Sequence, residues 1–163
     1  MMEKQHVFSE IQLELDQSGL AISTIDMDRP WGGFFVIKEN DAQKFIEKYF
    51  PDLNKDELLK GRLSPKILLV APNKKLSWQY HSRRSEIWKL IEGDAAVVTS
   101  DTDIENKTTS LKIGDTITLK KGERHRLVGL EVWGIVAEIW LHTDVNHLSD
   151  EDDIVRLQDD FGR

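Results

Sequence analysis

The chain has 163 residues, of which 39% are hydrophobic, and a formal net charge of −7. This length predicts one domain over residues 1–163, with enough apolar side chains to build a core. The acidic balance argues against nucleic-acid binding, which needs a broad basic surface, but it allows a local basic pocket for a phosphorylated small molecule. The absence of cysteine excludes disulfides, thiolate metal sites and cysteine nucleophiles.

The first residues, MMEKQHVFSE, contain neither the apolar run nor the small-residue cleavage site of a secretory signal. Apolar runs elsewhere reach about five residues, as at 67–71, whereas a membrane span needs about 20. We therefore expect a cytoplasmic protein with no membrane partner.

The N-terminal part of the chain gives mixed signals. Residues 1–28 alternate short apolar groups with acidic residues, which predicts either edge strands or a loose N-terminal arm. A turn at 29–33 (RPWGG) then leads into a strand at 34–37.

Two short helices are expected next. Apolar residues at helical spacing predict a helix over 41–49, with Asp41 as its N-cap. A second helix is expected over 54–60, where Asn54 and Glu57 have the spacing of a capping box. We interpret these helices as an insertion between strands.

From residue 64 onward, short apolar stretches alternate with turns at roughly ten-residue spacing, which predicts an all-β sandwich or barrel. Gly93-Asp94 and Gly114-Asp115 mark tight corners. Four tryptophans in this part, Trp78, Trp88, Trp133 and Trp140, are expected in the core. The expected strands cover residues 65–71, 75–81, 86–92, 94–100, 108–113, 115–119, 125–130 and 132–142.

Four polar residues in these strands have side chains that bind divalent metals. Gln79 and His81 are two apart, so on a strand they point to the same face. Glu86 follows shortly after, and His125 lies in a later stretch, GDTITLKKGERHRL. An amide oxygen, two imidazoles and a carboxylate form a plausible ligand set for a divalent ion.

The spacing resembles the first sequence motif of the cupin superfamily. Asn73, Gln79, His81, Glu86 and Gly93 stand at the motif positions. Two of them depart from the usual residues, because Asn73 replaces a glycine and Gln79 replaces a histidine.

The second cupin motif is matched further along the chain. Gly114, Lys120, Gly122, His125 and Gly129 stand at its positions, with Lys120 in place of proline and Gly129 in place of asparagine. The resemblance implies a double-stranded β-helix, or jelly-roll barrel, with a helical insertion near 41–61. It also implies one divalent ion held by Gln79, His81, Glu86 and His125.

Several segments together resemble the C-terminal isomerase domain of type II mannose-6-phosphate isomerases, over roughly residues 29–163. The family implies a metal-dependent aldose–ketose isomerase that interconverts mannose 6-phosphate and fructose 6-phosphate, without guanylyl transfer. Stand-alone relatives are sometimes labelled phosphoheptose isomerases, so the sugar stays open. The segments that carry the resemblance are RPWG at 29–32, Lys66, LSWQYH at 76–81, RSEIW at 84–88, GERHR at 122–126, EI at 138–139, EDDIVR at 151–156 and DFGR at 160–163.

The resemblance also implies roles for the remaining polar residues. Zinc is the metal it indicates, while manganese, iron or nickel fit the same ligands. A general base is needed as well, and the candidates are Lys66, Glu138 and a metal-bound water. The sugar phosphate needs cations, for which the candidates are Arg84, Arg124, Arg126, Arg156 and Arg163.

Three other functions compete with the isomerase. A non-catalytic cupin that binds a sugar phosphate or a nucleotide sugar is the main alternative. A metal-dependent oxygenase is disfavoured by Gln79, and a 3,5-epimerase needs a His–Asp base for which the sequence offers no matching pair. Because cupins often pair through edge strands, we expect a homodimer.

Overall fold

The computed structural model describes residues 3–162, and over this range nine strands form one antiparallel sheet, which confirms the all-β class. The strands are β1 (Ile22–Arg29), β2 (Gly32–Ile37), β3 (Lys66–Val70), β4 (Trp78–Tyr80), β5 (Arg84–Ser100), β6 (Thr109–Ser110), β7 (Thr116–Leu119), β8 (Arg124–His142) and β9 (Val155–Gln158). The helices are α1 (Lys4–Gln17), η1 (Glu39–Asp41), α2 (Ala42–Tyr49) and α3 (Lys55–Leu58). None of the helices in this range combines the length and apolar character that a membrane crossing requires.

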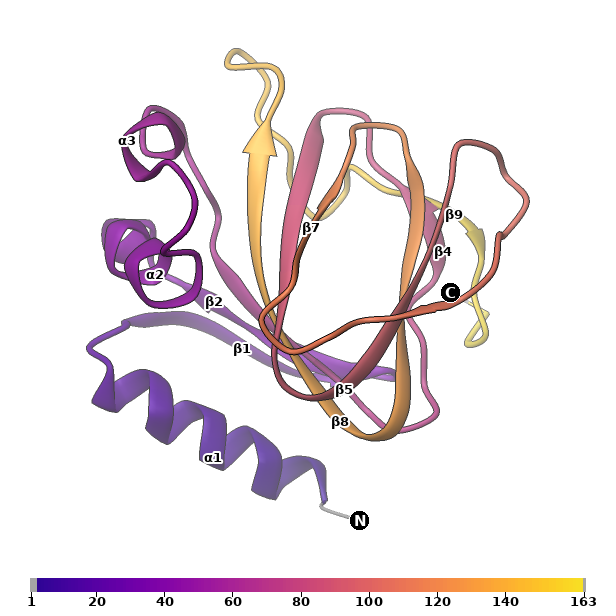
Figure 1. Ribbon diagram of the computed structural model, residues 1–163, viewed down its shortest axis with the longest axis horizontal. Helices are drawn as coiled ribbons and strands as arrows, with labels where there is room; N and C mark the ends of the chain where they lie inside the picture. Colours follow the sequence, from indigo (N-terminus) through magenta and orange to yellow (C-terminus); the bar gives the residue numbers. More distant parts are fainter. Residues whose placement is uncertain (1–2, 163) are drawn as a thin grey trace.

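Strands β5 and β8 are the centre of the sheet. They pair from Arg84↔His142 to Ser100↔Arg124, and around them the order is β1-β2-β3-β8-β4-β9, with β5 also paired to β6 and β7. Figure 1 shows that both strands curve strongly, so that the sheet wraps around an interior space.

The sequence predicted two shorter strands in place of each long one, with Gly93 at a tight corner. The structure instead has register shifts on both sides of Gly93, whose φ is +78°. A side chain there would meet the carbonyl oxygen of Trp133 at 1.8 Å, so the position requires glycine. The prediction of a corner was wrong because this bulge bends the strand without ending it.

Edge strands or a loose arm were expected over residues 1–28, but the structure has helix α1 in the first part of this range. Val7, Phe8, Ile11 and Leu15 are buried on one face of the helix, at the spacing of helical turns. The Phe8 ring packs against Phe35 of β2 with its centroid 5.3 Å away. Only the later part of the range, from Ile22, forms an edge strand, β1.

The helical insertion has the expected place, with different end contacts. The Asn54 side chain accepts the backbone N–H of Glu57 at 3.2 Å, which confirms it as the cap of α3. The Glu57 carboxylate pairs with Lys60 instead of closing a capping box. Asp41 accepts the N–H of Ala21 at 2.8 Å and therefore ties the insertion to the start of β1 instead of capping α2.

Two apolar clusters lie on opposite faces of the sheet. Along β3, Ile67 and Leu69 belong to the outer cluster, which α1 and α2 cover. Leu68 and Val70 belong to the inner cluster, inside the curve of the sheet. The alternation of strand side chains therefore turns Lys66 to the inner face. All four tryptophans predicted for the core are buried.

The C-terminal segment adds a strand that the sequence did not predict. Strand β9 pairs with β4, with Arg156 opposite Gln79, and this carries the preceding residues across one end of the interior space. Strands β1 and β9 stand at the two ends of the strand order. Pairing of two copies through such edges remains a prediction.

Candidate metal centre

Three predicted ligands meet on the inner face of the sheet. His81 follows β4, Glu86 lies on β5 and His125 lies on β8, and their ligand atoms fall within 4.8 Å of one another. The Glu86 carboxylate is 3.6 Å from Nε2 of His81 and 3.2 Å from Nε2 of His125. All three side chains are almost fully buried.

Backbone carbonyl groups fix the orientation of both imidazoles. Nδ1 of His81 lies 2.7 Å from the carbonyl oxygen of Asp153, and Nδ1 of His125 lies 3.1 Å from that of Glu123. Each Nδ1 therefore carries the proton and donates it outward, which leaves the Nε2 lone pair to face Glu86. Metal-binding histidines are typically held in this way.

The protonation state of His81 suits a ligand. Burial is the main cause that lowers the pKa of His81 to about 4, and the charges of His125 and Arg84 act in the same direction against that of Glu86. The imidazole is therefore neutral at neutral pH, as metal ligation requires.

Two atoms of this cluster lack a hydrogen-bond partner. Oε1 of Glu86 and Nε2 of His125 are buried and unpaired among the described residues, although they lie 3.2 Å apart. Two acceptors that face each other in a buried site are costly unless a cation lies between them. The residues therefore fit a divalent ion with nitrogen and oxygen ligands.

Gln79 lies beside the three ligands. Its Nε2 is 3.4 Å from Nε2 of His81, and its Oε1 accepts the hydroxyl of Ser77 at 2.6 Å. The amide oxygen thus points to Ser77, whereas the predicted ligation requires it to face the ion. A half-turn of the amide exchanges the two atoms, and the Ser77 hydroxyl can serve either. Ligation by Gln79 remains a prediction.

Arg84 contacts two of the predicted ligands, Glu86 and His81. Its Nε donates to Glu86 at 2.8 Å, one Nη lies 3.2 Å from Nε2 of His81, and the guanidinium stacks 3.6 Å from the ring centre of Trp140. Its other Nη donates to the hydroxyl of Ser149. Burial alone raises the pKa of Glu86, but the neighbouring His81 imidazole and Arg84 guanidinium together outweigh burial, so this pKa lies well below its ordinary value.

The predicted base candidates lie side by side on the adjacent wall. Glu138 of β8 pairs in register with Lys66 of β3. Its two oxygens accept the indole N–H groups of Trp88 at 2.6 Å and Trp140 at 2.8 Å. Burial first, and then the charge of Glu86, raises the pKa of Glu138 to about 7.

Lys66 is buried and bound from two directions. Its ammonium group lies 4.3 Å from the ring centre of Trp140 and 4.8 Å from that of Phe34. It also donates to the carboxylate of Glu151, from the C-terminal segment. Lys66 therefore contributes a fixed positive charge to the wall of the pocket.

The five predicted substrate-binding arginines do not come together. Arg84 and Arg156 line the pocket. Arg124 instead pairs with Asp103 and stacks on a tyrosine, and the buried Arg126 donates to the carbonyl oxygen of Leu76, so both are held outside the pocket lining. Arg163 lies outside the described residues.

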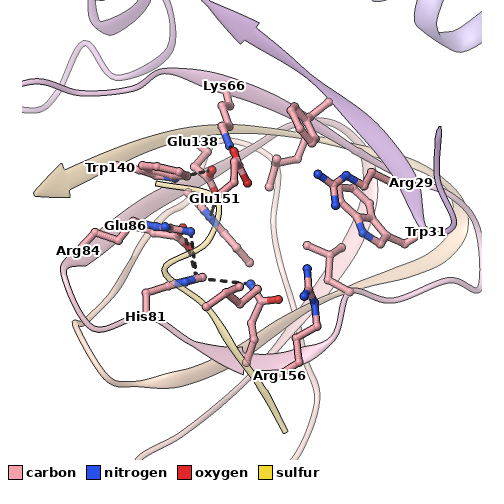
Figure 2. A pocket seen from close by; sticks show the side chains of 16 residues that line it. Arg29, Trp31, Lys66, His81, Arg84, Glu86, Glu138, Trp140, Glu151 and Arg156 are labelled. Atoms are coloured by element: carbon pink, nitrogen blue, oxygen red, sulfur yellow. Dashed lines mark hydrogen bonds and ion pairs between the residues drawn. The ribbon is translucent and has the colours of Figure 1, made fainter. Parts of the chain in front are cut away.

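Sequence reasoning missed several residues around this pocket. Figure 2 shows Arg29 and Trp31 on the side opposite His81 and Glu86, and Glu151 beside Lys66. The RPWG segment was the available signal, since it carries part of the family resemblance, but it gave Arg29 no role and left Trp31 open between a core position and the floor of a sugar-binding pocket. Nothing local in the acidic tail indicates that Glu151 reaches Lys66.

The C-terminal segment also holds His81 in place. The Asp153 carboxylate accepts the backbone N–H groups of Ser82 and Arg83 at 2.9 Å each and the hydroxyl of Ser149 at 2.6 Å. These bonds place the Asp153 carbonyl against the His81 ring. Burial opposes ionisation, but these donors and the charge of Arg83 lower the pKa of Asp153.

The structure resembles solved cupin-type proteins at low sequence identity. The capsular polysaccharide assembling protein CapF from Staphylococcus aureus matches with a TM-score of 0.55 and 13% identity, over 83% of this chain and 32% of that chain. KdgF from Halomonas sp. matches with a TM-score of 0.51 and 14% identity, over 76% of this chain and 90% of that chain. These matches confirm the fold expected from the cupin motifs.

Sequence comparison identifies closer relatives. The alginate biosynthesis protein AlgA of Pseudomonas aeruginosa is 30% identical over 78% of this chain and 26% of its own length. Mannose-1-phosphate guanylyltransferase 2 of Escherichia coli O157:H7 is 27% identical over 96% of this chain and 27% of its own length. The chain thus spans about a quarter of these curated relatives. The family described as mannose-6-phosphate isomerase C-terminal matches residues 56–159, and the chain belongs to this family.

Proposed function

We propose that the protein is a metal-dependent aldose–ketose isomerase that interconverts mannose 6-phosphate and fructose 6-phosphate. The observation that carries the proposal is the buried cluster of His81, Glu86 and His125, in which two acceptors face each other unpaired. The membership of the chain in the family described as mannose-6-phosphate isomerase C-terminal supports mannose 6-phosphate as the substrate.

The reaction moves two protons, one from C2 to C1 and one from O2 to O1. A base removes the proton from C2 of the aldose while the C1 carbonyl oxygen takes up a proton, which gives an enediol. Return of a proton to C1, with loss of the proton from O2, then gives the ketose. A divalent ion, when bound, stabilises negative charge on the sugar oxygens. We propose that His81, Glu86 and His125, with Gln79, hold this ion, and that it is zinc.

Glu138 is the base that the structure supports best. A pKa of about 7 keeps a large fraction ionised at neutral pH and matches the range in which a general base is efficient. Each carboxylate oxygen has two lone pairs, so the indole donors of Trp88 and Trp140 leave acceptor capacity for a proton. Lys66, fixed on the next strand, supplies positive charge beside it.

One observation favours the non-catalytic alternative, a cupin that binds a sugar phosphate without turnover. Glu138 is only 4% exposed, and both its oxygens already accept indole N–H groups. A base enclosed in this way reaches a substrate only if the pocket admits the reacting carbons deeply.

A coupled assay for fructose 6-phosphate formation, with and without chelator, separates these functions. Turnover of mannose 6-phosphate that chelator abolishes and added zinc restores supports the isomerase. Binding of mannose 6-phosphate without turnover under any metal supports the alternative. Oxygen uptake in place of isomerisation would indicate an oxygenase.

A further inference from the structure

Two of the four lysine and arginine side chains that line the pocket are fully paired. Lys66 donates to Glu151, and the Arg84 guanidinium donates to Glu86 and Ser149. Neither offers a free planar pair of N–H groups to an anion that enters the pocket. An anionic group of a substrate therefore needs other donors.

Two arginines in the lining have terminal guanidinium nitrogens that are not committed to a partner among residues 3–162. Arg29, the last residue of β1, uses Nε to bind Asp26 at 3.0 Å, and its terminal nitrogens have no hydrogen bond to residues 3–162. Arg156 of β9 is exposed, and its guanidinium has no hydrogen bond or ion pair within the same range. Each can present a bidentate fork.

The two guanidinium groups face the same part of the pocket. Figure 2 shows Arg29 and Arg156 entering from two separate elements, with Trp31 between them, on the side away from His81 and Glu86. The bond to Asp26 and the Phe34 ring, 5.4 Å from the Arg29 guanidinium carbon, restrict the rotamers of Arg29. The Arg29 side chain therefore loses less conformational entropy when an anion binds.

We propose that Arg29 and Arg156 form an anion subsite that binds the phosphate group of the substrate, across the pocket from His81, Glu86 and His125. The proposal rests on the proposed function for the identity of the sugar, but anion binding can be tested without turnover. A phosphate carries close to two negative charges near neutral pH, which two guanidinium groups complement. This arrangement directs the opposite end of the sugar toward the candidate metal centre.

The test is titration calorimetry of the full chain with inorganic phosphate and with mannose 6-phosphate. Arg29→Gln, Arg156→Gln and the double variant are compared with Arg124→Gln, which removes the same charge outside the pocket. Loss of a charge-assisted bidentate contact should weaken binding about tenfold or more in each single variant. The control should stay within about twofold, since Arg124 lies outside the pocket lining and its charge is already paired with Asp103.

Arg156→Gln removes no hydrogen bond present in the structure, so it keeps the test decisive even if Arg29→Gln perturbs β1. Equal phosphate affinity in Arg156→Gln and Arg124→Gln would overturn the proposal, as would a wild-type chain that does not bind phosphate. Arginine-dependent binding without turnover would support the subsite and reject the isomerase. Turnover of mannose 6-phosphate that is unchanged in Arg29→Gln and Arg156→Gln would support the isomerase and reject the subsite.

Discussion

Replacing Glu138 with glutamine tests the electrostatics of the candidate base. The substitution keeps the shape of the side chain and removes its charge. In the native chain each carboxylate oxygen accepts one indole N–H, from Trp88 or Trp140. Glutamine offers one oxygen and one NH₂ group, so one indole N–H loses its acceptor. This costs about 1–3 kcal/mol at any pH.

The charge adds a pH-dependent difference. The pKa of Glu138 is raised from 4.5 to about 7, so between these values the folded state binds more protons than the unfolded state. Stability therefore falls as pH rises through this window, and the loss is complete above pH 7. The linkage relation gives about 2.5 kcal/mol between pH 5 and pH 8. The stability of Glu138→Gln does not fall with pH in this way. The variant should therefore be less stable than the native chain at pH 5, and the two should be about equally stable, or the variant more stable, at pH 8.

Urea unfolding at pH 5, 6, 7 and 8, with chelator present, measures this difference. Other groups that titrate with folding, such as Asp153, are common to both proteins and cancel. Glu131→Gln, at an exposed position of the same strand, is the matched control and should track the native chain. If the difference between native chain and Glu138→Gln varied by less than about 1 kcal/mol over this range, burial would not set the pKa as argued.

Three further predictions concern the site. In activity assays Glu138→Gln should retain the metal and lose about 10²–10⁴-fold in kcat if Glu138 is the base, and unchanged turnover would clear it of that role. His125→Ala should lose the metal in elemental analysis while circular dichroism stays native-like; full occupancy would exclude His125 as a ligand. Asp153→Ala leaves the N–H groups of Ser82 and Arg83 without their acceptor and loosens the segment that orients His81. Its metal affinity should fall about 10–100-fold in a competition titration with a chelating dye, whereas Asp152→Ala, at an exposed neighbour, should not change it.

The all-β class and the cluster of candidate metal ligands were predictable from the sequence. Gln79 and His81 show their common face through a spacing of two residues, and the motif spacing connects them to Glu86 and His125. In the structure Gln79 pairs in register with His125, which brings the two motifs together. The resemblance to the two cupin motifs was therefore what predicted that His81, Glu86 and His125 lie together.

Other parts depend on contacts between residues far apart in the sequence. Asp153 orients His81 from 72 positions away, and Glu151 reaches Lys66 from 85 positions away. A short acidic stretch near the end of a chain has many possible partners, and its composition does not choose among them. The sequence likewise indicated a turn at Arg29 without showing that this turn opens onto the pocket.

Helix α1 was missed for a related reason. Its buried residues, the adjacent Val7 and Phe8 and then Ile11 and Leu15, are interspersed mainly with charged and polar residues, and this mixture is also compatible with edge strands. The helix has an apolar face whose partner, the outer surface of β2, becomes visible only in the fold. The Phe8–Phe35 contact shows this dependence, since neither residue has a local partner that would indicate it.

The two faces of the sheet divide stability and chemistry between them. The inner face holds ionisable groups that an ordinary core would exclude, among them Lys66, Arg84, Glu86 and Glu138. Buried charges of this kind add little net stability even when they are paired. The outer face is apolar and covered by α1 and α2, so its hydrophobic burial is not interrupted by these ionisable groups, which on the inner face lie beside the second apolar cluster. Because the outer cluster lies on the other face of the sheet from His81, Glu86 and His125, it stabilises the curved sheet while the inner face keeps its polar cluster.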